Sequence, residues 1–501
     1  MERRTFLKIL SSAGIVSLVS PTFAMEVCKN KVSKSSSALL ESAFRNPPFS
    51  SGVYTWWHWM NGNITKDGIT RDLEAMKANG IAGYQLFEAG SGIPIGPVES
   101  LSDEWVDLIL HTLKESERLG LEFAMHNCPG WSSSGGPWIT PDKAMQIITW
   151  SETKITVGKQ VRIQLPTPKH MFDYYIDTYC LAIPANMKVI PRLSILELSN
   201  RLDKDGVLTW DVPTGEWLIM RFGQTAKDQK NKSAPSKSTG LDCDKFSTEA
   251  LDYHLNCMFK RLMPAMEKIA KHSKIGLLID SYETGDQDWT SDMPAYFEQS
   301  HGYELYPFLP VLANKIVESE ESTKRFLFDF RRVRADMFAE RYYGHFQKRC
   351  KEKGIITYTE PYGGNMMEEL QVAQQLDINM GEFWCGQTVL WANYKYNRTV
   401  KQVASIAHTL GGKVVGAEAF TSEPDADKWL QYPYALKSLG DYMFTRGLSR
   451  IYFHRFAHQP HPTAAPGMTM GAWGLHFDRT NTWWKPGKAW IEYLNRCQYI
   501  F

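Results

Sequence analysis

The residues best suited to chemistry are four glutamates, each of which closes an apolar run typical of a buried strand. The run K-I-G-L-L-I at 274–279 leads into D-S-Y-E, so that Asp280 and Glu283 stand at its end. The other three glutamates are Glu360, Glu382 and Glu418. Carboxylates crowded into one cleft repel one another unless a cation, an arginine or a shared proton relieves them. Such crowding fits a carboxyl pair that cleaves a glycosidic bond, or a calcium ion with several oxygen ligands.

Histidines offer a second kind of site. His58, His126 and His454 lie at the ends of three predicted strands and, with the carboxylates, could bind zinc or iron. No H-E-x-x-H motif or short ligand spacing supports a metal hydrolase, which stays as an alternative. The serine run at 132–134 lacks a G-x-S-x-G elbow, and no glycine-rich phosphate-binding motif follows a strand. A serine nucleophile and a bound nucleotide therefore have no support.

Other polar and aromatic residues gather near the ends of the same apolar runs, and we expect them to contact a substrate. They are His58, Trp59, Asn61, His126, Asn127, Trp131, Tyr282, Glu360, Trp384 and His454. The loop P-G-W-S-S-S-G-G-P-W at 129–138 suits close approach of its backbone to a ligand. The chain has 17 Trp, 22 Tyr and 24 Phe, which can fill a core or line a cleft that stacks on sugar rings.

Eight apolar runs alternate with helical sequence, which predicts an α/β fold of the (β/α)8 barrel type. The predicted strands are 53–60, 81–87, 121–128, 274–280, 355–360, 378–384, 413–420 and 450–456. Thr65 is expected to cap a helix over 66–79 and Ser102 one over 103–119, and a long helix is expected over 244–272. The carboxyl ends of barrel strands form one mouth, where the glutamates should meet. A doubly wound open sheet is the alternative.

The alternation breaks after the third predicted strand. Residues 141–225 hold short apolar runs separated by turn residues, which indicates an inserted antiparallel β unit. The expected organisation is the first part of the barrel at 45–140, the insertion at 141–225, and the remainder of the barrel at 226–501.

Residues 1–24 are typical of a targeting segment. R-R-T-F-L-K precedes a short apolar stretch at 9–19, and T-F-A at 22–24 offers a small-residue cleavage site. The segment resembles a bacterial twin-arginine signal, which predicts export to the periplasm. No later run reaches 18 apolar residues, and a formal net charge of +1 gives no basic surface for nucleic acid. The eight cysteines form no C-x-x-C pair, so a thiolate zinc site is not expected.

Four longer motifs occur in order along the chain. They are W-W-H-W-M-N-G-N-I-T (56–65), H-N-C-P-G-W-S-S-S-G-G-P-W-I (126–139), D-S-Y-E (280–283) and G-A-E-A-F-T (416–421). Together they resemble glycoside hydrolase family 106, the α-L-rhamnosidases, from about residue 45 to the carboxyl terminus. The resemblance implies an exported bacterial enzyme with an interrupted (β/α)8 barrel, a calcium-assisted site and inversion at the anomeric carbon.

The resemblance also implies roles for single carboxylates. Glu283 in D-S-Y-E matches the general acid, and Glu418 in G-A-E-A-F-T matches the general base that activates water. Glu382 in G-E-F-W is the competing base, or belongs to the calcium and substrate shell. The candidate calcium ligands are Glu382, Glu360 and Asn61. An inverting pair of carboxyl groups should lie about 6.5–9.5 Å apart, which leaves room for water.

The leading expectation is an exo-acting glycoside hydrolase that removes terminal α-L-rhamnose from a carbohydrate, by an inverting acid/base mechanism with calcium assistance. One alternative is a barrel glycosidase specific for a different sugar, because fold and machinery do not fix the substrate. Another is a carbohydrate-binding protein that has lost turnover. Members of the family usually continue into further β domains, whereas this chain stops at C-Q-Y-I-F (497–501).

Overall fold

The computed structural model describes the chain from residue 34 onward, with short gaps. The described ranges are 34–90, 92–131, 134–156, 158–270, 274–385, 394–412, 414–423, 428–471 and 475–501. The predicted signal segment at 1–24 lies outside them, as do Ser132 and Ser133. Within these ranges, no helix is long and apolar enough to cross a membrane.

Parallel strands close into a barrel in the order β1, β18, β17, β16, β15, β13, β3 and β2. Their bounds are β1 (Tyr54–Met60), β2 (Gly83–Ala89), β3 (Glu122–His126), β13 (Ile275–Ile279), β15 (Ile356–Thr359), β16 (Ile378–Cys385), β17 (Val415–Ser422) and β18 (Arg450–Ala457). Each predicted strand overlaps an observed one, and the prediction of an α/β barrel is confirmed.

Helices accompany the barrel strands, and two of them begin where the sequence predicts. The Thr65 side chain accepts from the Gly68 N–H at the start of α4 (Lys66–Ala78), and Ser102 caps α5 (Asp103–Leu119) through the Trp105 N–H. The other described helices are α3 (Lys34–Arg45), α6 (Thr248–Phe259), α7 (Met263–Ile269), α8 (Met293–His301), α9 (Leu309–Leu312), α10 (Glu320–Met337), α11 (His345–Lys351), α12 (Glu369–Ala373), α13 (Tyr394–Leu410), α15 (Pro433–Thr445) and α16 (Lys488–Ile500).

The helix expected over 244–272 is two helices, α6 and α7. Pro264 stands in the first turn of α7, where its missing N–H costs nothing. The same residue inside one continuous helix would remove a hydrogen bond and clash with the preceding turn. The chain therefore breaks after Phe259 and restarts at Met263.

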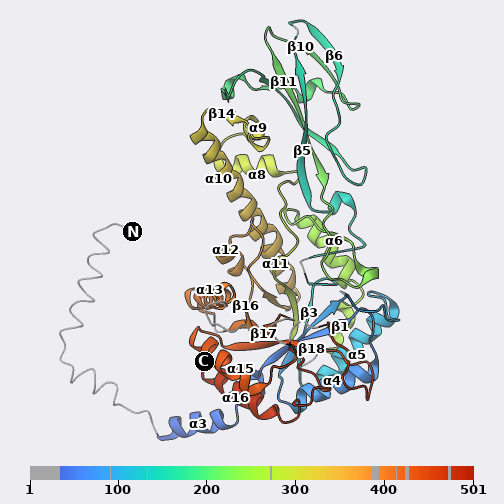
Figure 1. Ribbon diagram of the computed structural model, residues 1–501, viewed down its shortest axis with the longest axis vertical. Helices are drawn as coiled ribbons and strands as arrows, with labels where there is room; N and C mark the ends of the chain where they lie inside the picture. Colours follow the sequence, from blue (N-terminus) through green and yellow to red (C-terminus); the bar gives the residue numbers. More distant parts are fainter. Residues whose placement is uncertain are drawn as a thin grey trace, which may run out of the picture.

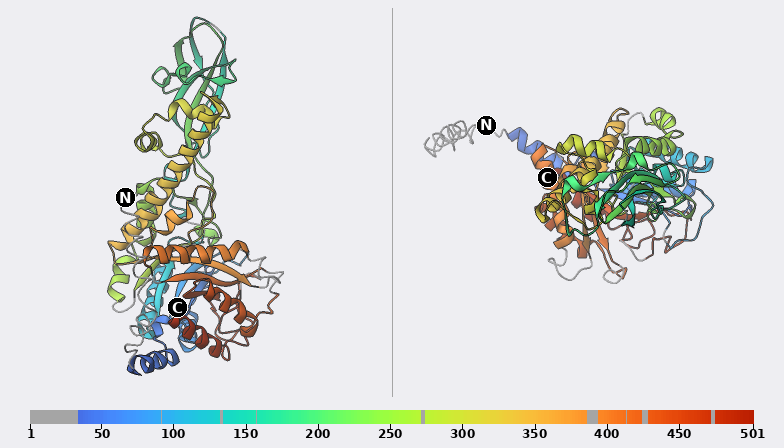
Figure 2. Two further views of the ribbon diagram at one scale, coloured as in Figure 1. Left: turned by 90° about the vertical axis from the view of Figure 1, so that its left-hand side faces the viewer. Right: turned by 90° about the horizontal axis from the view of Figure 1, so that it is seen from above.

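Between β3 and β13 the chain forms antiparallel sheets. One has the order β5 (Gln146–Ile155), β11 (Trp217–Ala226), β7 (Ile176–Pro184) and β9 (Leu196–Glu197), and β6 (Gln160–Gln164) pairs with β10 (Val207–Asp211). Leu208 and Trp210 alternate with exposed residues along β10 and pack into a core of their own with Ile219. Figures 1 and 2 show these strands at the end of an elongated molecule opposite the barrel, with α8, α9 and α10 next to them.

Aromatic rings fill the amino-terminal end of the barrel. Tyr54 begins β1, donates to Glu122 Oε2 at 2.7 Å, and lies 5.2 Å from the Tyr452 ring between centroids. Gly83 on β2 leaves room for this packing, because a Cβ there would meet the Tyr54 ring. With this end closed, the barrel is left to open at the carboxyl ends of its strands.

Candidate active site

A cavity of about 750 Å³ opens at the carboxyl ends of the barrel strands, and we call it the catalytic cavity. Asp280 and Glu283 line it just after β13, Glu382 lines it from β16, and Glu418 from β17. Three of the four glutamates predicted to meet therefore share one cavity. Glu360, which follows β15, is fully buried and is not part of the lining.

Glu382 and Glu418 are neighbours on adjacent strands, because they are register partners of β16 and β17. Trp384 Nε1 donates to Glu382 Oε2 at 3.1 Å, and the Thr421 hydroxyl donates to Glu418 Oε1. Burial raises the pKa of Glu418 well above its usual range, and repulsion from Glu382 and then Asp280 raises it further. Glu418 therefore binds a proton far more readily than an exposed glutamate.

Glu283 occupies a more open place in the same cavity. Its side chain is 38% exposed, against 8% for Glu418. Lys232, from the loop at 226–240, places its Nζ 2.7 Å from Glu283 Oε2. This ion pair links Glu283 to the loop at 226–240. The two carboxyl groups thus stand at the mouth and in the depth of one cavity, in unlike surroundings.

Asp280, which lines the cavity, and Glu360, which does not, form a carboxyl pair. Burial raises both pKa values well above the usual range. Repulsion from Asp280 raises the pKa of Glu360 further, so the pair binds a proton more readily than two exposed carboxyl groups would. The Tyr362 hydroxyl donates to Glu360 Oε2. The pair therefore contributes less negative charge to the cavity than two free carboxylates would.

Two neutral imidazoles complete one wall. Burial lowers the pKa values of His58 and His454 well below the usual range. The Arg455 cation lowers both further, and a neighbouring histidine adds to the effect in each case. His454 Nδ1 lies 4.0 Å from Glu418 Oε1, and the His454 ring meets Trp56 edge-on at 5.3 Å between centroids. Neutral imidazoles can exchange hydrogen bonds with sugar hydroxyls without adding charge.

Only part of the predicted substrate contact set reaches this cavity. His58, Trp131, Trp384 and His454 line it, whereas Trp59, Asn61, His126, Asn127, Tyr282 and Glu360 do not. Successive side chains of a strand point to opposite faces. Because His58 faces the barrel interior, Trp59 faces outward, where its ring packs against Trp57 and His458.

The side chains of Asn61 and Asn127 form hydrogen bonds with backbone groups and do not line the cavity. Asn61 Nδ2 donates to Ile93 O at 2.6 Å, and its Oδ1 accepts from Ser236 N at 3.3 Å. Asn127 Nδ2 donates to Leu278 O at 2.9 Å. The amide of Asn61 is thus occupied at both ends, away from the carboxylates with which it was expected to bind calcium.

His126 and Tyr282 also have structural partners. His126 Nε2 accepts from the Asp280 N–H at 3.4 Å, and its Nδ1 contacts the backbone of Cys128. Burial lowers the pKa of His126 to about 4. The Tyr282 hydroxyl donates to Gly285 O at 2.7 Å. Both side chains therefore fix the turns at the ends of β3 and β13.

Sequence reasoning missed several cavity residues, among them Trp56 and Lys232. Strand alternation could have found Trp56, because it lies two residues before His58 and shares its face. Lys232 has no such signal. It lies in a polar loop whose folding over the barrel mouth depends on contacts distant in sequence, such as Asn231 Nδ2 donating to Pro129 O.

Most of the chain is similar to known glycoside hydrolases. A family model described as alpha-L-rhamnosidase, glycoside hydrolase family 106, matches residues 45–181 and 169–501. The chain belongs to glycoside hydrolase family 106. The predicted membership is confirmed.

Two relatives are informative. A Formosa agariphila protein named "Putative beta-glucuronidase" is 40% identical over 492 residues, which cover 92% of this chain and 41% of that protein. A solved rhamnosidase from Novosphingobium sp. PP1Y matches with a TM-score of 0.84 at 24% identity, over 92% of this chain and 60% of that one. The rhamnosidase structure shows that the fold is shared. This chain spans less than two thirds of the length of either relative.

Proposed function

We propose that this protein removes terminal α-L-rhamnose from carbohydrates by a single displacement that inverts the anomeric carbon. The observation that carries the proposal is the pair of carboxyl groups in unlike surroundings, Glu283 at the mouth and Glu418 in the depth of the catalytic cavity. An inverting glycosidase uses two carboxyl groups that face the sugar from different positions, one as acid and one as base.

Glu283 suits the general acid because of its place. In an exo-acting enzyme the terminal sugar enters the depth of the cavity, and the leaving group points out of the mouth. A proton donor must therefore stand near the mouth, where Glu283 is the carboxyl group with the larger exposure. A leaving group at the mouth would lie against Glu283 and the exposed Lys232 ammonium that pairs with it.

Glu418 suits the general base once it has lost its proton. The Thr421 hydroxyl that donates to Glu418 Oε1 supports the ionised form, and the neutral His454 lies 4.0 Å from the same oxygen. Repulsion from Glu382 opposes ionisation. Water held by Glu418 would attack the anomeric carbon from the side opposite the leaving group. Glu382, beside it, is the alternative base.

The lining of the cavity favours a neutral sugar with an apolar edge. Rhamnose is a 6-deoxy sugar, and its methyl group and ring face suit the indoles of Trp56, Trp131 and Trp384. The name of the Formosa relative raises a β-glucuronide as the second candidate. A glucuronate needs a cation for its carboxylate. Among the described lining residues the one lysine, Lys232, is paired with Glu283, and there is no arginine.

Calcium assistance is part of the proposal through the family resemblance. Carboxylate oxygens are the donors that calcium prefers, and a bound cation would relieve the repulsion among Asp280, Glu382 and Glu418. Among the described residues, however, no three His, Cys, Asp or Glu side chains lie close enough together to hold an ion. The expected ligands Glu360 and Asn61 are engaged with Tyr362 and with backbone. The roles of Glu283 and Glu418 are therefore assigned from their own positions and not from an ion.

We also propose that the twin-arginine segment at 1–24 directs export to the periplasm. The motif R-R-T-F-L-K before an apolar stretch supports this. In a fractionated bacterial host, rhamnosidase activity should accompany a periplasmic marker, and Arg3→Lys with Arg4→Lys should retain it in the cytoplasm. Periplasmic activity of that double variant would contradict the proposal.

The acid assignment is tested by Glu283→Gln assayed across leaving groups. An alkyl α-L-rhamnoside needs protonation of its leaving oxygen, so its kcat/KM should fall by about 10²–10⁴-fold. A nitrophenyl α-L-rhamnoside leaves without that help and should lose far less. Binding of rhamnose, measured by calorimetry, should persist.

Glu418→Gln is the matched comparison. Loss of the base slows water attack whatever the leaving group, so both rhamnosides should lose activity to the same extent. An equal loss in Glu283→Gln, or retained turnover of the alkyl rhamnoside, would contradict the acid role. A parent protein that binds rhamnose but hydrolyses neither rhamnoside would instead be a carbohydrate-binding protein.

A further inference from the structure

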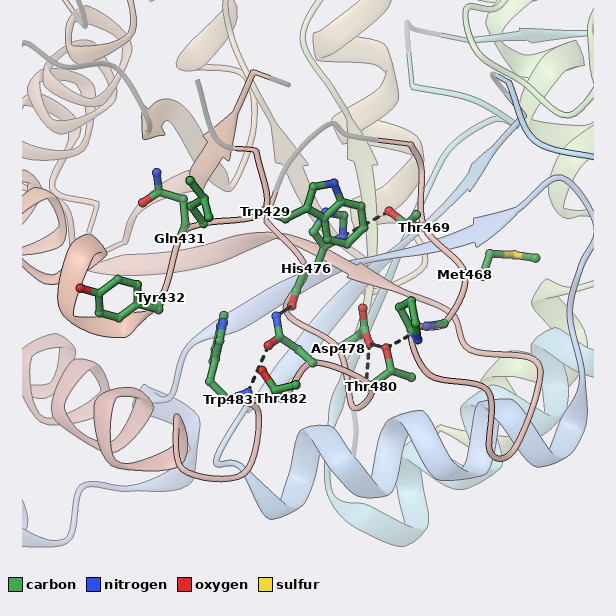
Figure 3. Close-up of a pocket in the computed structure, with 14 residues that line it drawn as sticks. Trp429, Gln431, Tyr432, Met468, Thr469, His476, Asp478, Thr480, Thr482 and Trp483 are labelled. Carbon is green, nitrogen blue, oxygen red and sulfur yellow. Dashed lines mark hydrogen bonds between the residues drawn. The ribbon is translucent and has the colours of Figure 1, made fainter. Parts of the chain in front are cut away.

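A second cavity, of about 380 Å³, lies beside the catalytic cavity, and we call it the aromatic pocket. It is formed by the segment at 429–432, which follows β17 in the chain, and by the segments at 466–469 and 476–483, which follow β18. Figure 3 shows side chains from these separate segments gathered around one hollow. The carboxylates of the catalytic cavity take no part in it.

The pocket presents aromatic surface that the core does not use. The Trp429 ring stacks on His476 with 3.3 Å between centroids and 6° between planes, and Trp429 remains 52% exposed. Tyr432 is 50% exposed and lies in the same wall. Trp483 adds a third ring from the other side of the hollow, as seen in Figure 3. Exposed rings around a concave site are typical of surfaces that stack on the flat faces of sugars.

The floor of the pocket is polar and fixed. Asp478 Oδ1 accepts from the Thr480 N–H at 2.8 Å and from its hydroxyl, and Asn481 Nδ2 donates to His476 O at 2.7 Å. Figure 3 shows this chain of hydrogen bonds beneath the rings. A floor held by its own hydrogen bonds keeps the pocket in shape before a ligand arrives, which lowers the entropy cost of binding.

Other polar groups of the wall are available to a ligand. The Gln431 amide and the Tyr432 and Thr482 hydroxyls line the pocket and form no hydrogen bond with a described residue. No lysine or arginine is among the described residues that line the pocket, and burial lowers the pKa of His476 to about 3, which keeps it neutral. The chemistry of the wall therefore suits a neutral ligand with hydroxyl groups.

The aromatic pocket and the catalytic cavity share one wall. Met468 and Thr469 line the pocket, whereas Met470 and Gly471, next along the chain, line the catalytic cavity. Arg455 Nη2 donates to Thr469 Oγ1 at 3.1 Å, and the residue before Arg455 is the cavity residue His454. A chain of sugars that leaves the catalytic cavity over the segment at 468–471 would pass directly into the aromatic pocket.

We propose that the aromatic pocket is a second sugar-binding subsite, which takes a neutral glycosyl unit from the leaving-group part of the substrate. The proposal rests on the proposed exo-acting function, in which the terminal rhamnose fills the catalytic cavity. With this subsite, the preferred substrate is a carbohydrate longer than a disaccharide. The unit bound in the aromatic pocket is then a neutral sugar and not a uronic acid.

The test compares a short and a long substrate in Trp429→Ala and Tyr432→Ala. The probes are a nitrophenyl α-L-rhamnoside, which reaches only the catalytic cavity, and a neutral trisaccharide with terminal α-L-rhamnose. For the trisaccharide, KM should rise by about tenfold with kcat retained, the effect expected of one lost aromatic contact. The nitrophenyl rhamnoside should keep its kcat/KM within about twofold, far below the change that one aromatic contact gives.

Tyr434→Ala is the matched control, because Tyr434 is 82% exposed in the same segment and does not line the pocket. It should leave both substrates unchanged. Equal losses on both substrates in Trp429→Ala and Tyr432→Ala, or no loss on the trisaccharide, would overturn the subsite. A trisaccharide with glucuronic acid at the inner position should not respond to either variant, and a tenfold response would overturn the neutral class.

Failure of the proposed function is distinguishable from failure of the subsite. If neither probe is hydrolysed, the function fails, and the subsite is then read by calorimetry with the same neutral trisaccharide. Binding to the parent that weakens about tenfold in both pocket variants would support the subsite alone. Absence of binding, or binding unchanged by both variants, would overturn it.

Discussion

The pKa of Glu418 connects the crowding of carboxylates to the pH at which the enzyme should work. A general base must be ionised, and burial together with Glu382 raises the pKa of Glu418. Activity should therefore be lost as the pH falls through that raised value, at a higher pH than an ordinary glutamate would give. The acidic limb of the profile of kcat/KM is the observable.

Glu382→Gln should move that acidic limb to lower pH. The change removes the negative charge that, after burial, raises the pKa of Glu418 most. Turnover on a nitrophenyl rhamnoside should persist, with a reduced kcat because the hydrogen bond from Trp384 is altered. Full pH profiles of the parent and the variant measure the shift.

Glu99→Gln is the control for this experiment, because Glu99 pairs with Lys237 outside the catalytic cavity. Its profile should match that of the parent. Complete loss of turnover in Glu382→Gln would assign the base role to Glu382 in place of Glu418. An unmoved limb would contradict the link between the two carboxyl groups.

For single residues, the sequence predicts which carboxyl groups reach the cavity better than it predicts their hydrogen-bond and ion-pair partners. Glu283, Glu382 and Glu418 could be found because apolar runs mark strands and barrel strands end at one mouth. The hydrogen bond from Asn61 to Ile93 O could not be predicted, because it depends on how a distant loop folds back. The ion pair of Glu283 with Lys232 is hidden for the same reason.

Among the elements, α4 and the segment after β18 are joined through one buried carboxylate. Asp72 of α4 accepts from His458 Nδ1 at 2.8 Å, from the Gln459 N–H at 3.0 Å and from Arg479 Nε at 2.8 Å. Trp57 Nε1 of β1 donates to it as well. Because this segment supplies walls of both cavities, Asp72 fixes them to the barrel.

Asp72→Ala should destabilise the protein by about 3–5 kcal/mol, because it leaves the Arg479 charge without its partner in a largely buried place. Urea unfolding measures the change. Asp67→Ala on the same helix is the control, since Asp67 is exposed and pairs with Arg71 one turn away. Its unfolding free energy should stay close to that of the parent. Equal destabilisation by the two changes would contradict the bridging role.

The elements that the sequence predicts well are those with strong local signals. Ser102 caps the start of the helix over 103–119 as expected, and Gly120 adopts a left-handed conformation at its end. The helix over 244–272 was wrong as one element, because its apolar pattern continues through the break before Pro264. Periodicity alone does not reveal such an interruption.

At the scale of the whole molecule, calcium is expected to act on stability as well as on the site. A ligand that binds only the folded state stabilises it by about 2.7 kcal/mol at a hundred times its dissociation constant. Calcium added to chelator-treated protein should therefore raise Tm and restore turnover together. Magnesium, which is smaller and holds its water tightly, is the control and should do neither. An unchanged Tm and full turnover after chelation would contradict the calcium proposal.

The fold class of the whole molecule was predictable because eight strands repeat one simple pattern. The placement of the antiparallel strands was not, because it depends on packing between distant segments. Tyr179 of β7 stacks on Tyr306 with 5.9 Å between centroids, and β8 (Val189–Ile190) pairs with β14 (Ile316–Val317). Such contacts join residues more than a hundred positions apart and leave no local signal.

The most direct test of the central claim is the anomer released first from an α-L-rhamnoside. If Glu283 donates the proton and Glu418 activates water, one displacement inverts the anomeric carbon. Proton NMR early in the reaction should then show β-rhamnose before mutarotation brings in the α form. α-Rhamnose as the first product would mean retention through a covalent intermediate and would contradict the account.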